Sequence, residues 1–142
     1  MINRKCLYAG SFDPITLGHL DVILQAAQDF DLVQIALMSN PAKINQKRLE
    51  LNQELIQDVI NDLYSKEIYN IVLLDPDKTR GRLLVDVAKE NETKVLIRGI
   101  KGVTSLDEEM LLNFNNRKLA DVRTVWYRSE EHTSELQSPN TI

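Results

Sequence analysis

The chain has 142 residues, of which 43% are hydrophobic and 27% charged, and its formal net charge is −4. This length suits one domain, because single domains typically have about 100–200 residues. No apolar run approaches the ~18 residues of a membrane-spanning helix, and the N-terminus lacks the apolar region of a signal peptide. The mild acidity argues against binding to nucleic acid or to an anionic membrane, since both are negative themselves. We therefore expect a cytoplasmic protein that binds neither.

Strand-like and helix-like segments alternate along the chain. Short apolar runs, typical of strands buried on both faces, cover residues 5–9, 32–38, 71–74, 95–97 and 122–127. Helical spacing of apolar residues, and for the last segment a capping-box spacing, predicts helices over residues 18–29, 49–63, 83–88 and 105–119. This alternation predicts an α/β fold with a doubly wound, five-stranded parallel sheet.

Such a sheet binds ligands beyond the carboxyl ends of its strands, which indicates the turns at residues 10–19, 39–43, 75–82 and 98–102. The first turn reads GSFDPITLGH, so Ser11, Thr16 and His19 cluster between a strand and a helix. A helix N-terminus attracts phosphate, and a histidine there adds a side-chain donor. An ordinary loop with Thr16 as helix cap and an incidental histidine is the alternative. The clustering favours a phosphate site that is neither the three-glycine dinucleotide turn nor the Walker lysine loop.

The same decapeptide resembles the signature of the nucleotidyltransferase superfamily whose motif is (H/T)-x-G-H. Within it, the chain is most similar to the bacterial phosphopantetheine adenylyltransferase family. Further matches follow in order: NPAK at residues 40–43, VLIRG at 95–99 and NRKL at 116–119. The resemblance covers about residues 5–127 and implies a Rossmann-like nucleotidyltransferase fold.

The resemblance implies an enzyme of coenzyme A biosynthesis that transfers AMP from ATP to 4′-phosphopantetheine, giving dephospho-coenzyme A and pyrophosphate. It implies Mg²⁺ as cofactor with ATP, no protein metal ligand, and a homo-oligomer, typically a hexamer. The catalytic residues that it implies are His19, Lys43 and Arg98. The implied ATP-binding residues are Ser11, Phe12, Thr16, His19, Gly99, Ile100, Lys101 and Glu109. The implied 4′-phosphopantetheine-binding residues are Ser11, Lys43, Leu84 and Arg98.

Simpler interpretations stand beside some of these assignments. Lys43 alone fits a solvated loop lysine, Leu84 fits the core, and Glu109 fits a helix-surface acid. Lys101 replaces an arginine common in the family, and lysine lacks the fork that binds phosphate bidentately. Two other functions stay open: a sister nucleotidyltransferase with another acceptor, and a non-catalytic nucleotide-binding module.

Residues 128–138, RSEEHTSELQS, resemble the translation of a common sequencing-adapter oligonucleotide. They show no helical or strand period, although a genuine polar tail is the alternative. We therefore expect a nucleotidyltransferase domain over residues 1–127 that lacks the family's final helical segment, followed by a disordered tail over 128–142. Turnover should then be impaired, since each lost phosphate donor can cost on the order of 10²–10³ in rate.

Overall fold

The computed structural model describes residues 4–39, 42, 44–100 and 121–129. In this part of the chain, five strands form one sheet in the order β3-β2-β1-β4-β5, and every neighbouring pair is parallel. The strands are β1 (Lys5–Gly10), β2 (Leu32–Leu37), β3 (Ile71–Leu73), β4 (Val95–Ile100) and β5 (Arg123–Arg128). The predicted doubly wound parallel fold is confirmed.

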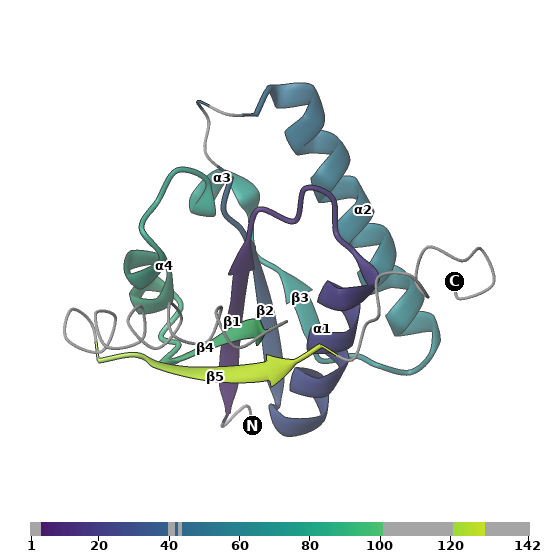
Figure 1. The fold of residues 1–142 in the computed structure, drawn as a ribbon, viewed down its shortest axis with the longest axis vertical. Coiled ribbons are helices and arrows are strands. Elements are labelled where there is room, and N and C mark those ends of the chain that lie inside the picture. The colour runs from purple at the N-terminus through teal and green to yellow at the C-terminus, as the bar shows by residue number, and fades with distance from the viewer. Residues whose placement is uncertain (1–3, 40–41, 43, 101–120, 130–142) are drawn as a thin grey trace.

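Helices cover both faces of this sheet (Figure 1). They are α1 (Leu17–Asp29), α2 (Gln46–Ser65), α3 (Pro76–Thr79) and α4 (Leu84–Glu90). One core cluster joins α1 and α2 to one face of the sheet, and a second joins α4 to the other face. Because both faces are covered, the strands read as nearly continuous apolar runs. None of the helices in the described part is both long and apolar enough to span a membrane.

Helix α2 begins earlier than predicted, and one short helix was not predicted. Helix α2 begins at Gln46 rather than 49, because the Asn45 side chain caps it by accepting the Arg48 N–H at 2.8 Å. The short helix α3 was not predicted, since four residues carry no measurable period. Asp75 caps it and Pro76 occupies its first turn, which is a favoured position for proline. The helix predicted over residues 105–119 lies outside the described residues.

Strand β4 is longer than predicted. It continues to Ile100, so Arg98 and Gly99 lie within the strand rather than in the turn after it. The pairing with β5 explains this, because the ladder runs from Val95↔Arg123 to Ile100↔Arg128. The backbone N–H of Ser129 also donates to the Ile100 carbonyl at 3.3 Å. Strand β5 accordingly ends at Arg128, one residue beyond the predicted end of the strand at 127.

The order of the strands locates the crevice of the fold. From β1 the chain moves outward through β2 to β3, then returns to the other side of β1 for β4 and β5. The direction reverses between β1 and β4, and ligands of doubly wound sheets bind beyond the carboxyl ends of the strands at this switch point. The turn predicted to handle phosphate follows β1 and lies at that point.

Candidate active site

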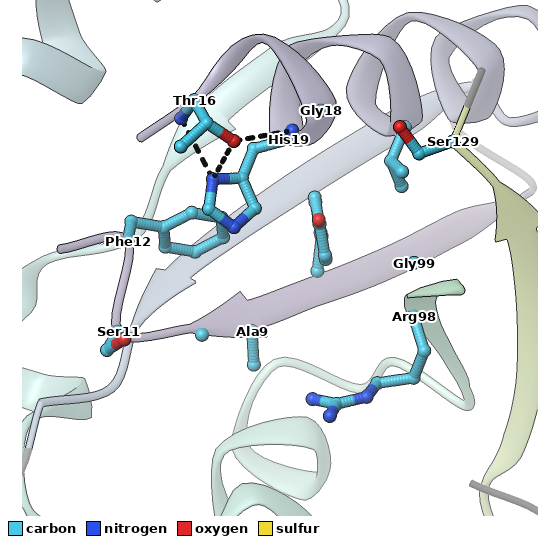
Figure 2. A pocket seen from close by; sticks show the side chains of 12 residues that line it. Ala9, Ser11, Phe12, Thr16, Gly18, His19, Arg98, Gly99 and Ser129 are labelled. Carbon is cyan, nitrogen blue, oxygen red and sulfur yellow. Dashed lines mark hydrogen bonds between the residues drawn. The ribbon is translucent and has the colours of Figure 1, made fainter. Parts of the chain in front are cut away.

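A cavity of about 550 Å³ lies at the carboxyl ends of β1 and β4, beside the first turn of α1 (Figure 2). Six predicted site residues line it: Ser11, Phe12, Thr16, His19, Arg98 and Gly99. They come from the β1–α1 turn, the start of α1 and the end of β4. Residues far apart in the sequence therefore meet at the predicted edge of the sheet.

His19 and Thr16 form the N-terminal cap of α1. The imidazole Nδ1 of His19 accepts the backbone N–H of Thr16 at 2.9 Å, and the Thr16 hydroxyl accepts the His19 backbone N–H at 3.3 Å. A backbone N–H can only donate, so Nδ1 carries no proton and the neutral ring carries its hydrogen on Nε2. The cap thereby makes Nε2 a hydrogen-bond donor at a helix N-terminus, where phosphate is already favoured.

The buried ring of Phe12 packs against the imidazole of His19. The Phe12 ring is 2% exposed and packs edge-on against His19 at a centroid distance of 5.0 Å, and against Tyr8 at 5.2 Å. The backbone of Phe12 is in the left-handed region, with φ 43°, which costs of order 1–3 kcal/mol for a residue with a side chain. Burial of the ring offsets that cost. Phe12 is predicted only to bind ATP, and in the structure its ring also packs against His19.

Arg98 and Gly99 point to opposite faces of the sheet. Arg98 shares its face with Leu96 of the α4-side cluster, because strand residues alternate. Its guanidinium extends toward the carboxyl end of β1 (Figure 2). Gly99 faces α1, where an added Cβ would lie 3.1 Å from Val22 Cγ2. Gly99 therefore allows β4 to approach α1 closely. Its predicted role in binding ATP is a separate assignment.

Two other predicted site residues are described but do not line the cavity. Ile100 ends β4 beside Arg128, and Leu84 begins α4 and packs against the second core cluster. The position of Leu84 agrees with the simpler interpretation as a core residue. Lys43, Lys101 and Glu109 lie outside the described residues, so their assignments stay predictions.

Sequence reasoning missed two polar residues of the cavity wall, Tyr8 and Ser129. In sequence Tyr8 is only a residue of the first strand, and strand alternation places it on the same face as Gly10, where the phosphate turn begins. Burial raises the pKa of Tyr8 to about 12, which the positive charge of Arg98 partly opposes. Tyr8 is therefore a neutral phenol beside the cavity. Ser129 falls within the segment predicted to be a polar tail.

Together, the fold and the site define a nucleotide-binding domain of the nucleotidyltransferase type: a phosphate-facing turn precedes α1 at the switch point of a doubly wound sheet,. Comparison with known proteins agrees with this class. Residues 7–141 match the cytidylyltransferase-like family. A phosphopantetheine adenylyltransferase from Clostridium tetani is 35% identical over 133 residues, covering 93% of this chain and 78% of the relative. One from Natranaerobius thermophilus is 34% identical over 136 residues, covering 95% of this chain and 78% of the relative.

The chain therefore belongs to the cytidylyltransferase-like family and, within it, to the phosphopantetheine adenylyltransferases. A solved structure with a similar fold is the Plasmodium falciparum nicotinic acid mononucleotide adenylyltransferase complexed with APC. It superposes with a TM-score of 0.59 at 13% identity, covering 98% of this chain and 81% of that one. At this identity the likeness concerns the fold alone.

Proposed function

We infer that this protein transfers AMP from ATP to 4′-phosphopantetheine, releasing pyrophosphate and forming dephospho-coenzyme A. The observation that carries the proposal is the placement of His19 and Arg98 around the carboxyl end of β1. His19 lies on the α1 side and Arg98 on the α4 side, with Ser11 at the end of the strand between them (Figure 2). Two phosphate-bearing substrates could thus approach from opposite faces and meet beside Ser11.

The proposed reaction is a displacement at the α-phosphorus of ATP. A phosphate oxygen of 4′-phosphopantetheine forms the new P–O bond, and the bond to the β-phosphate bridging oxygen breaks as pyrophosphate leaves. Catalysis of phosphoryl transfer rests on positioning and on stabilising charge at the phosphate oxygens. In this proposal the Nε2–H of His19 and the first amides of α1 bind the ATP phosphates. Arg98 holds the acceptor phosphate, for which its planar fork of donors is suited.

The remaining assignments belong to the same proposal and are supported by the resemblance. Lys43 would contact the acceptor phosphate, Leu84 the pantetheine, and Lys101 and Glu109 the ATP. Mg²⁺ would enter as the counter-ion of ATP, because this ion keeps much of its water and binds substrate phosphates readily. We also propose that the protein is cytoplasmic and forms a homo-oligomer. Sedimentation of the purified chain would test the oligomeric state.

A pyrophosphate-release assay across nucleotides and acceptors tests the proposed function. Pyrophosphate should form with ATP and 4′-phosphopantetheine together, and not with either one alone. Faster release with CTP or with another phosphate-bearing acceptor would instead favour a sister nucleotidyltransferase. Calorimetry with ATP in the same buffer identifies a non-catalytic module, which would bind ATP without releasing pyrophosphate.

A further inference from the structure

Asp13, a residue of the phosphate turn, is hydrogen-bonded to helix α2. This residue follows Phe12, which lines the cavity. One carboxylate oxygen of Asp13, Oδ1, accepts a hydrogen bond from Arg48 Nε at 2.6 Å and another from Asn52 Nδ2 at 2.9 Å. Arg48 and Asn52 are four residues apart in α2 and therefore lie on one face of the helix. Two donors from one helix thus converge on one oxygen of the turn.

Asn52 is unusual for its position. The buried residues of α2 are Leu49, Asn52, Ile56, Ile60 and Leu63, so a single amide interrupts an apolar stripe. Asn52 is 1% exposed, and a buried amide is costly unless it is hydrogen-bonded. An apolar residue would complete the stripe, so packing of α2 does not account for Asn52. Its hydrogen bond to Asp13 does.

Arg48 forms an ion pair with the same carboxylate of Asp13. The Arg48 side chain is 57% exposed and that of Asp13 is 31% exposed, and exposed ion pairs contribute little stability. The two hydrogen bonds, that from Asn52 foremost, hold the pKa of Asp13 below its usual value. Asp13 therefore stays ionised at neutral pH and keeps both donors.

The backbone of the turn is strained, so contacts in addition to the burial of the Phe12 ring help to fix its conformation. Phe12, the residue before Asp13, has φ 43°, and such a conformation persists only where its surroundings determine it. The Phe12 ring is fixed against Tyr8 and His19 on one side, and Asp13 is fixed against α2 on the other. Release of Asp13 would let the turn relax, and Ser11 and the Thr16 cap would move with it.

We propose that Asn52 and Arg48 are positioning residues, which hold the phosphate turn in its working geometry through the Asp13 carboxylate. They act through Asp13 on Ser11, Thr16 and His19. This inference rests on the proposed function for its catalytic consequence, but its structural part concerns the turn alone. A misplacement of about 1 Å in a reacting site can lower the rate by about 10²-fold.

The test uses the full chain with Asn52→Leu and Arg48→Gln. Leucine completes the apolar stripe of α2, so the fold should be retained, and Arg48 is too exposed for its replacement to unfold the core. The matched control is Arg82→Gln, which removes the Arg82–Glu90 ion pair of the same 2.6 Å length away from the turn. Hydrogen exchange is measured at the backbone amides of residues 11–13, 15 and 16, since Pro14 has none. Pyrophosphate release is measured with both substrates.

Asn52→Leu should speed exchange in the turn roughly tenfold and lower kcat by about tenfold, within the range known for misplaced groups. The KM for 4′-phosphopantetheine should change less than kcat, because Arg98 lies on β4 and, among the described residues assigned to this substrate, only Ser11 lies on the turn. Asp13→Ala should behave like Asn52→Leu, whereas Asp13→Asn should retain most of the activity, since its amide oxygen still accepts both donors.

Exchange in the turn equal to that of Arg82→Gln, in both Asn52→Leu and Arg48→Gln, would overturn the inference. A parent protein that releases no pyrophosphate would count against the proposed function instead. The exchange measurement would still decide the role of Asn52 and Arg48, because it needs no substrate.

Discussion

The imidazole of His19 is the most informative group to remove, because one substitution separates a structural from a chemical role. His19→Ala deletes the acceptor of the Thr16 N–H, which lies 2.9 Å from Nδ1. It also deletes the ring that packs edge-on against Phe12 at 5.0 Å. Finally, it deletes the Nε2 donor proposed to face the ATP phosphates.

The structural part of this loss should be small. One hydrogen bond contributes about 1 kcal/mol, and an edge-to-face ring contact about 0.5–1.5 kcal/mol. The free energy of unfolding should therefore fall by about 2 kcal/mol. The catalytic part should be larger, since removal of one oriented donor from a transition state costs about 10²–10³ in kcat.

Pyrophosphate release and urea unfolding measure the two parts on the same samples. Gln28→Ala is a suitable control, because Gln28 is an exposed residue of the same helix and does not line the cavity. A His19→Ala variant that binds ATP and keeps kcat within about threefold of the parent, far from the expected loss, would refute the donor role.

The tautomer can be tested without any substrate. Nitrogen-15 NMR should show the His19 ring with its hydrogen on Nε2 and an unprotonated Nδ1. The chain has 2 histidines, so the spectrum of His19→Ala assigns the signal. A hydrogen on Nδ1 in the neutral ring would contradict the capping geometry on which the proposal rests.

Four further outcomes are expected. Gly99→Ala puts a Cβ 3.1 Å from Val22 Cγ2, so overpacking should lower the free energy of unfolding in urea by about 1–3 kcal/mol, and Val22→Ala should restore part of it. Arg98→Lys replaces a planar fork by a point charge, so calorimetry should show roughly tenfold weaker binding of 4′-phosphopantetheine, while ATP affinity should hold. The lowered pKa of Asp13 means that its contribution to stability is full above about pH 4 and is lost as the pH falls through the folded-state value. The urea midpoint of Asp13→Asn should accordingly change less than that of the parent between about pH 5 and pH 3. Cys6 is buried and its pKa is raised to about 12, so a thiol reagent at pH 8 should label it only after unfolding, because the thiolate is the reactive form.

Much of the site was predictable because its signals are local. The turn from Gly10 to His19 carries glycine, hydroxyl and imidazole within one strand-to-helix connection, and helix capping depends on residues only three apart. Arg98 was predictable for a related reason, since a charge at the end of an apolar strand is costly unless it has a use. Leu84 was not decided by sequence, because an apolar residue on a short helix fits the core and a ligand channel equally well.

The contact between Asp13 and α2 could not be predicted from sequence, because 35 and 39 residues separate Asp13 from Arg48 and Asn52. In sequence, Asn52 is only an interruption in an apolar stripe, and Arg48 is a charge on a helix. The extension of β4 through Arg98 was missed for the same reason. Strand length depends on pairing with β5, and that pairing is non-local.

The sequence by itself determined the class of fold and the chemistry of the first turn, because apolar periodicity and helix capping act over a few residues. Tertiary structure decided which residues meet at the cavity and which face of the sheet each occupies. It brought His19 and Arg98 to opposite sides of β1, gave Phe12 its place under the imidazole, and joined Asn52 to the turn. These facts depend on strand order and on packing between distant segments, which local propensity does not encode.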